Sequence, residues 1–371
     1  MKAVACVFDQ AFYAKAMEVF WKHKAQFEGL VIMMGGFHLL MTLLAIIGSR
    51  FGDAGLRDVA VQSEVIAEGS IDSVLSGKHY NRAVRLHKIM YEAIAQLLVH
   101  DFESSLCENE FELLNEQNAQ LEQLKMNLCQ EEMKEILESD LLQQWENRFQ
   151  EHIAGIKQNG SDLAKFWLTY LELCELPLDL INATRTGNWE LYLACIEAVI
   201  PWTFAYDRQN YARYLLPYLN DMRALPTVMP EVYDAFVAGH FSVQMSKGNP
   251  FGQNEADKTI ENTINRDCKT AGGYIGFSAN FAATQRWVLN YSRRSSYKRI
   301  LREHLSLLSS ENKAQKELTP SRIRSDMEAV ASVLESVFCS PWNRDVQQLT
   351  SLSTRLQPVA KVLETLYRIL A

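Results

Sequence analysis

The chain has 371 residues, of which 48% are hydrophobic and 10% aromatic, so it is long enough for one large core or two ordinary ones. Only 17 glycines and 9 prolines interrupt it, which favours long helices and argues against an all-β sandwich or barrel with many turns. A net charge of −8 excludes a protein coated all over with cations for nucleic acid. The composition therefore predicts a mostly helical globular protein.

The number and spacing of the cysteines favour a reducing cellular compartment. Seven are present, none forms a Cys-x-x-Cys pair, and no amino-terminal signal precedes them. This pattern argues against a disulfide framework or a zinc ribbon. We therefore expect an intracellular protein, in the nucleus or the cytoplasm, where thiols stay reduced.

The first segment predicts a parallel βαβ unit. Ala3–Phe8 and Leu30–Met34 are short apolar runs, and Ala11–Phe27 between them has helical spacing. Two buried parallel strands need a helix between them on one face. Gly35-Gly36 then forms a turn, and Phe37–Ile47 forms the next helix.

A membrane span competes with this interpretation. Leu30–Gly48 contains 19 consecutive residues without a formally charged side chain, which is the length of a spanning helix. The two glycines and His38 would then lie inside lipid, where a polar side chain is costly. We therefore prefer the strand, turn and helix, and expect no membrane contact.

The acidic residues gather in one segment of an otherwise helical chain. Residues 101–151 hold 14 acidic side chains against three basic ones, and apolar residues recur there at steps of three and four. This pattern predicts an amphipathic helical hairpin, either a surface feature of the fold or an arm that binds a partner. The breaks in the chain predict five parts, namely a βαβ core with the first helices (1–100), the acidic hairpin (101–157), a helical region (158–238), a glycine-rich region with a basic helix (239–310) and C-terminal helices (311–371).

Three acidic residues are candidates for chemistry. The chain has no P-loop, G-x-G-x-x-G, H-E-x-x-H or G-x-S-x-G motif. Asp9 follows the first strand, where open α/β sheets assemble their sites, but it is also placed to cap the next helix. Asp257 and Glu261 are four apart on a short predicted helix, Ala256–Asp267, where they too have a structural reading. A strand-end aspartate and a helix-borne glutamate would suit a divalent metal such as Mg²⁺, so we take Asp9 and Glu261 as candidate ligands.

A basic segment near the C-terminal third is the strongest binding signal. It carries six cations without one acid, interleaved with Trp287, Tyr291 and Tyr297. Such a segment could follow a nucleic acid backbone and stack on bases, or it could pack against the acidic hairpin of the same chain. The six cations are Arg286, Arg293, Arg294, Lys298, Arg299 and Arg302.

Several strings along the chain resemble an uncharacterised group of long, multi-copy proteins from coral, mollusc and fish genomes that derive from mobile elements. They cover most of the chain and are specific as a set. The strings are Val7–Ala16, Met34–His38, Arg50–Asp58, Tyr80–Arg85, Gly187–Trp189, Tyr206–Arg213, Asn249–Gly252, Asp257–Glu261 and Thr270–Gly273.

The resemblance implies a ribonuclease-H-like, transposase-type core with a large helical insertion. Asp9, His38 and Glu261 match the group's strand end, turn and helix, and the acidic helices become an insertion between the second and third acids. Such cores place their first aspartate on a β-hairpin before this point, so the resemblance implies a truncated core that lacks one acid. We therefore expect a protein that is inactive alone or depends on another chain for the missing strand.

Two hypotheses follow from the sequence. In the first, the protein is a transposon-derived remnant of a magnesium-dependent strand-transfer or nuclease domain that can bind DNA. In the second, it is a non-enzymatic, mostly helical interaction scaffold in which the same acids are structural.

Overall fold

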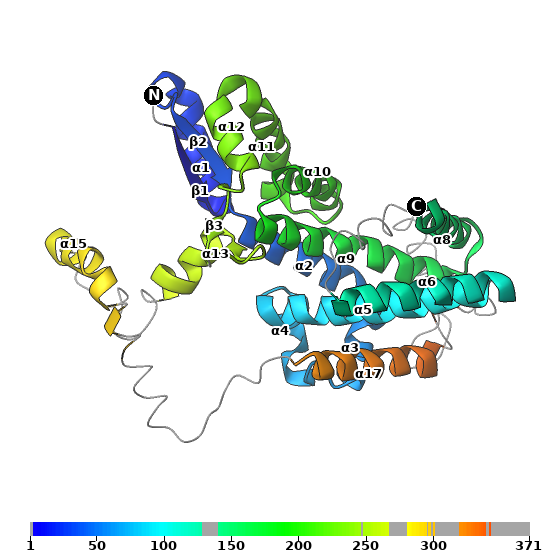
Figure 1. Ribbon diagram of the computed structural model, residues 1–371. Helices are drawn as coiled ribbons and strands as arrows, with labels where there is room; N and C mark the ends of the chain where they lie inside the picture. The colour runs from blue at the N-terminus through cyan, green and yellow to red at the C-terminus, as the bar shows by residue number, and fades with distance from the viewer. Residues whose placement is uncertain are drawn as a thin grey trace. The chain divides into compact units, whose positions relative to one another are not determined.

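The computed structural model describes residues 3–127, 140–245, 248–266, 280–294, 296–297, 300, 319–338 and 341–342. Helices make up most of these residues, and the described strands form two small sheets of two strands each (Figure 1). The expected mostly helical class with a small α/β element is confirmed.

The chain forms two compact units, each built from separate stretches of sequence. The first contains residues 1–42 and 179–322, and the second contains residues 43–178 and 323–371. The chain passes from one unit to the other inside three helices, which are α2 (Gly36–Phe51), α9 (Asp162–Thr186) and α17 (Pro320–Phe338).

The first unit holds both sheets and a set of helices. The strands are β1 (Val4–Phe8), β2 (Leu30–Met34), β3 (Val243–Gln244) and β4 (Gln253–Asn254). The helices wholly inside the unit are α1 (Gln10–Lys22), η1 (Lys24–Gln26), α10 (Trp189–Ala205), α11 (Gln209–Val228), α12 (Pro230–Val237), α13 (Ala256–Ile260), η4 (Glu261–Asn265) and α15 (Phe281–Leu289).

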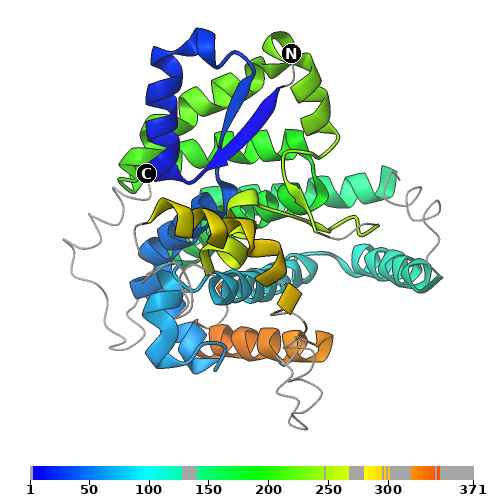
Figure 2. The same cartoon turned by 90° about the vertical axis from the view of Figure 1, so that its left-hand side faces the viewer.

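The predicted βαβ unit is present. Strands β1 and β2 pair in parallel, in a register that runs from Val4 opposite Leu30 to Phe8 opposite Met34. Helix α1 connects them and packs against β2 and α11 (Figure 2). Four of the five β2 residues are buried, because their apolar side chains face packed helices, whereas Val4 on β1 is 55% exposed. Both strands therefore end at the same edge of the sheet, where the candidate acid Asp9 lies.

The apolar stretch that competed as a membrane span is split between a strand and a helix. Leu30–Met34 is β2, and α2 begins directly after Gly35. Among the described residues, one continuous helical stretch, Gly36–Gln62, is long and apolar enough to cross a membrane, with a mean hydropathy of 1.4 in its most apolar window. Sixty-one per cent of that window is buried inside the protein.

Two helices continue through prolines. Helix α10 contains Pro201 and runs on to Ala205, and α11 contains Pro217 and Pro226 and runs on to Val228. A proline inside a helix removes one backbone hydrogen bond. Burial on both sides of Pro201, of Val199 before it and of Thr203 after it, keeps the helix intact.

The second unit contains helices and no strand among its described residues. Besides the portions of α2, α9 and α17 that it contains, it includes η2 (Gly52–Leu56), α3 (Arg57–Gln62), η3 (Glu68–Ser70), α4 (Ile71–Leu75), α5 (Tyr80–Ser104), α6 (Glu108–Asn127) and α8 (Asp140–Asn159). Helices α6 and α8 are the described parts of the acidic hairpin, and they are joined by the Glu110–Arg148 ion pair. Residues 128–139 of the hairpin lie outside the described residues.

A buried polar group lies between α5 and α9 in this unit. His87 Nδ1 is 2.9 Å from the Tyr170 hydroxyl, and the Cys174 sulfur lies 3.9 Å from the same nitrogen. Burial lowers the pKa of His87 to about 4, so the imidazole is neutral at physiological pH. This group joins the two helices in its uncharged state.

Candidate functional site at the ends of β1 and β2

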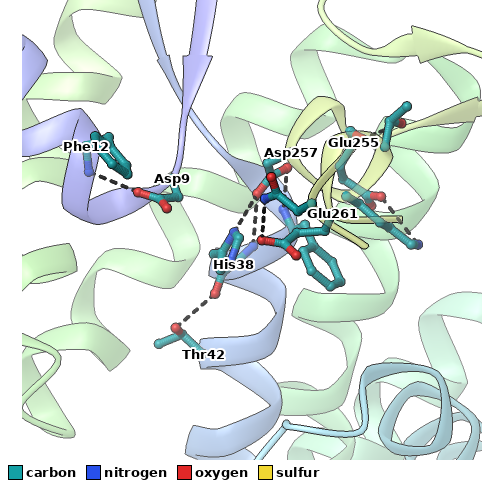
Figure 3. Close-up of polar contacts among 11 residues, drawn as sticks. Asp9, Phe12, His38, Thr42, Glu255, Asp257 and Glu261 are labelled. Atoms are coloured by element: carbon teal, nitrogen blue, oxygen red, sulfur yellow. Dashed lines mark hydrogen bonds and ion pairs between the residues drawn. The ribbon is translucent and has the colours of Figure 1, made fainter. Parts of the chain in front are cut away.

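The candidate site is built from parts of the first unit that are far apart in sequence. Asp9 follows β1, His38 lies in the first turn of α2 after β2, and Asp257 and Glu261 lie in α13 and η4 (Figure 3). Helix α13 packs against β1. The close-up shows His38 with Asp9 on one side and the segment that carries Asp257 and Glu261 on the other.

Asp9 caps helix α1. Its backbone is extended, and its Oδ1 accepts a hydrogen bond of 2.9 Å from the Phe12 amide. This is the helix-capping role that the sequence left open beside a catalytic one. A cap occupies one carboxylate oxygen and fixes the side chain at the strand end, so the cap is compatible with a second role.

Asp257 caps a helix other than its own. Glu255 is the N-cap residue of α13, whereas the Asp257 carboxylate reaches α2 and accepts hydrogen bonds of 3.2 Å from the Phe37 and His38 amides. Its Oδ2 also lies 3.0 Å from His38 Nδ1, which must donate because an ionised carboxylate only accepts. Asp257 is 6% exposed. A buried negative charge at a helix N-terminus is stabilised by the unpaired amides and the helix dipole.

Gly35 makes this approach possible. A Cβ at Gly35 would lie 2.4 Å from Asp257 Oδ2 and 2.7 Å from Cγ, and a Cβ at Gly36 would be 3.5 Å from Glu255 Cγ. The sequence assigned the glycine pair to a turn. In the structure, Gly35 also provides the room that the Asp257 carboxylate occupies.

The pKa of His38 is raised by all three acids. Its hydrogen bond with Asp257 raises the pKa of His38 above 6.5, partial burial opposes the rise, and the charges of Asp257, Asp9 and Glu261 add to it. Asp9 and Glu261 are therefore both close enough to act electrostatically on one imidazole, although 252 positions separate them in the sequence. Asp9 and Glu261 lie on opposite sides of His38, beside the ends of the two strands (Figure 3).

Tyr211 on α11 was not among the sequence-predicted site residues. It is 8% exposed, and burial raises its pKa, helped by the charges of Asp257 and Asp9, while a hydrogen bond with Thr42 opposes the rise. Thr42 in turn donates to the His38 carbonyl at 3.0 Å. The sequence around Tyr211 is polar and rich in tyrosine, but nothing in that local pattern links it to α2.

Glu255 and Lys258 complete the local charge arrangement. Glu255 is 5% exposed, and its Oε2 lies 3.4 Å from Lys258 Nζ. Glu261 Oε1 accepts a hydrogen bond of 2.9 Å from Asn265 within η4. The segment that carries Glu261 is thus held by an internal ion pair and by the Asp257 contacts with α2.

The donor set suits a hard cation only in part. Among the described residues, no three His, Cys, Asp or Glu side chains are arranged to hold a metal ion. Magnesium, however, usually keeps several waters and takes only one or two protein carboxylates together with substrate phosphates. Asp9 and Glu261 are of the residue type that such a smaller set requires, whereas the carboxylate of Asp257 already accepts three hydrogen bonds.

The predicted basic segment is described in part. Arg286 lies on α15, Arg293 and Arg294 follow it, and Lys298, Arg299 and Arg302 lie outside the described residues. The Arg294 guanidinium carbon lies 3.6 Å from the centroid of the Trp287 ring, and the side chain donates to the Trp287 carbonyl at 2.9 Å.

Residues 1–366 match the family described as a domain of unknown function (DUF8702), and the chain belongs to this family. No curated protein and no solved structure matches the chain.

Proposed function

We propose that the protein is transposon-derived and retains part of a magnesium-dependent strand-transfer or nuclease site on a ribonuclease-H-like core with a helical insertion. The observation that carries the proposal is the position of Asp9 and Glu261 on opposite sides of His38, where the charges of both raise its pKa, beside the ends of two parallel strands. Open sheets of this kind assemble their sites at that edge.

The residues have distinct roles in this proposal. Asp9 and Glu261 would hold the ion, and a bound Mg²⁺ would neutralise charge on an approaching phosphate. Asp257 is a positioning residue, because it fastens the segment before Glu261 to the start of α2. His38 lies close to the acids, and its hydrogen bond with Asp257 and their charges raise its pKa, which favours its protonated form.

Two protein carboxylates bind magnesium more weakly than three. The resemblance to transposase-type cores implies a further acid on a strand that would pair with the sheet. Metal binding by this chain and DNA cleavage by it are therefore separate properties, and we propose that it binds magnesium but needs another polypeptide for cleavage.

A non-enzymatic scaffold is the second candidate function. It is favoured by one observation, which is that Asp9 and Asp257 both cap helices. In this alternative the acids hold the fold together, and the acidic hairpin of α6 and α8 binds a partner.

The two functions differ in what an amide at position 9 would do. Asp9→Asn keeps an oxygen that can cap α1 but removes the charge, and Glu261→Gln removes the second charge. The measurement is the thermal unfolding midpoint during a Mg²⁺ titration, followed by cleavage of supercoiled plasmid at the same concentrations. A ligand that binds only the folded state raises its stability in proportion to RT ln(1 + [L]/Kd).

Asp234→Asn and Glu190→Gln are matched controls, because both residues are exposed on helices of the same unit. We expect magnesium to raise the midpoint of the unaltered protein and of both controls, but not of Asp9→Asn or Glu261→Gln. If magnesium shifted the midpoint equally in all five proteins, or in none of them, the metal site would be refuted and the scaffold would remain. Cleavage by the chain alone, lost in Asp9→Asn, would retain the site but refute the need for a second polypeptide.

A further inference from the structure

Helix α15 and the residues after it expose large apolar side chains instead of burying them. No residue of α15 is buried. Phe281 is 79% exposed, Leu289 73% and Tyr297 68%. Burying such side chains against a partner lowers the free energy of the system, so their exposure indicates an interaction surface.

The same segment is positively charged. Among residues 280–294, 296–297 and 300 there is no acidic side chain, and Arg286 and Arg293 are exposed. Arg294 differs, because it stacks on Trp287 within the segment. A surface of exposed cations and rings without an acid is complementary to a polyanion that also presents flat apolar groups.

Single-stranded nucleic acid has that combination of groups. Its phosphates pair with arginines, and its unpaired bases stack on aromatic side chains. A duplex offers its phosphates, but its bases are already stacked, so Phe281 and Tyr297 would remain exposed. We propose that Phe281, Arg286, Arg293 and Tyr297, here called the α15 surface, bind single-stranded nucleic acid.

This inference stands apart from the proposed metal site, because binding is measured in EDTA, where no magnesium site is occupied. The probe is a fluorescently labelled 20-nucleotide oligo(dT), and the readout is anisotropy across a series of salt concentrations. The full chain is used throughout. A 20-base-pair duplex and vesicles of anionic phospholipid are tested alongside it.

Two pairs of variants separate charge from stacking. Arg286→Gln and Phe281→Ala alter the α15 surface, while Arg213→Gln and Phe204→Ala remove an exposed arginine and a 60% exposed phenylalanine elsewhere in the same unit. We expect Phe281→Ala to weaken oligo(dT) binding about tenfold and Arg286→Gln to reduce the salt dependence by about 0.7 in the log–log slope. The two control variants should bind as the unaltered protein does.

Three results would overturn the inference. The first is binding that does not weaken with salt. The second is equal affinity for duplex and single strand with no effect of Phe281→Ala, which would indicate phosphate contacts alone. The third is retention on anionic vesicles without binding to oligo(dT), which would make α15 a membrane-surface helix.

Discussion

The contact between Gly35 and Asp257 can be tested by a double-mutant cycle. In Gly35→Ala the new Cβ would lie 2.4 Å from the Asp257 Oδ2, about 1 Å inside ordinary van der Waals contact. The carboxylate must then move away from the Phe37 and His38 amides that it caps. We expect Gly35→Ala to cost about 2–3 kcal/mol, since overpacking alone costs about 1–3 kcal/mol and lost charged hydrogen bonds add to it.

The second arm of the cycle is Asp257→Ala. It removes the acceptor of three hydrogen bonds and leaves two amides of α2 without a cap, for which we expect a loss of about 3 kcal/mol. In the double variant the clash with Oδ2 is gone, although the Cβ at position 257 remains 3.1 Å away. The cost of the double variant should therefore be smaller than the sum of the two single costs by about 1–2 kcal/mol.

Urea unfolding measures the free energies, and hydrogen exchange of the peptide that covers residues 34–40 reports the first unit directly. Faster exchange of the Phe37 and His38 amides should accompany each single variant. Costs that add to within about 0.5 kcal/mol would contradict the reasoning, because they would mean that Gly35 and Asp257 do not share a contact.

Three further outcomes follow from other contacts. Because the folded-state pKa of His38 is raised above 6.5, its pairing with Asp257 stabilises the protein fully below that pH and is lost as pH rises through the raised value, so Asp257→Asn should flatten the stability profile there. The lowered pKa of His87 has the opposite effect, because between pH 6.5 and 4 the unfolded chain binds a proton that the folded protein does not. The free energy of unfolding should therefore fall by about 3 kcal/mol as the pH is lowered from 6.5 to 4. Urea unfolding at each pH measures this fall, and His87→Gln should remove most of it. Gly48→Ala would place a Cβ 2.0 Å from a backbone carbonyl at the end of α4 and should lower the free energy of unfolding by about 1–3 kcal/mol, measured by urea unfolding. Gly155→Ala, with open space around it on α8, should raise the free energy of unfolding by about 0.5–1 kcal/mol.

The local parts of the site could be predicted from the sequence. Two short apolar runs with a helical segment between them predicted the parallel strands, and the position of Asp9 directly after the first run predicted both its strand-end location and its capping of α1. These features depend on neighbouring residues, so periodicity and capping rules reach them.

The long-range contacts could not be predicted in the same way. Asp257 meets amides that lie 219 and 220 positions away, and no local pattern specifies such a partner. The sequence feature related to this contact is Gly35, whose missing side chain leaves room for the Asp257 carboxylate. A glycine pair after a strand is, however, equally typical of a turn. Pro201 inside α10 shows the same limit of local patterns, because burial along the helix outweighs the helix-breaking preference of one residue.

The central claim is that the carboxylates of Asp9 and Glu261 hold a divalent cation together. The most direct test is a crystal of the full chain soaked in Mn²⁺, which prefers the same oxygen ligands as Mg²⁺ and gives an anomalous signal. The account predicts an anomalous peak within coordination distance of both carboxylates, and its loss in Asp9→Asn. A map in which the two carboxylates lie too far apart to share an ion, with no peak near His38, would contradict it.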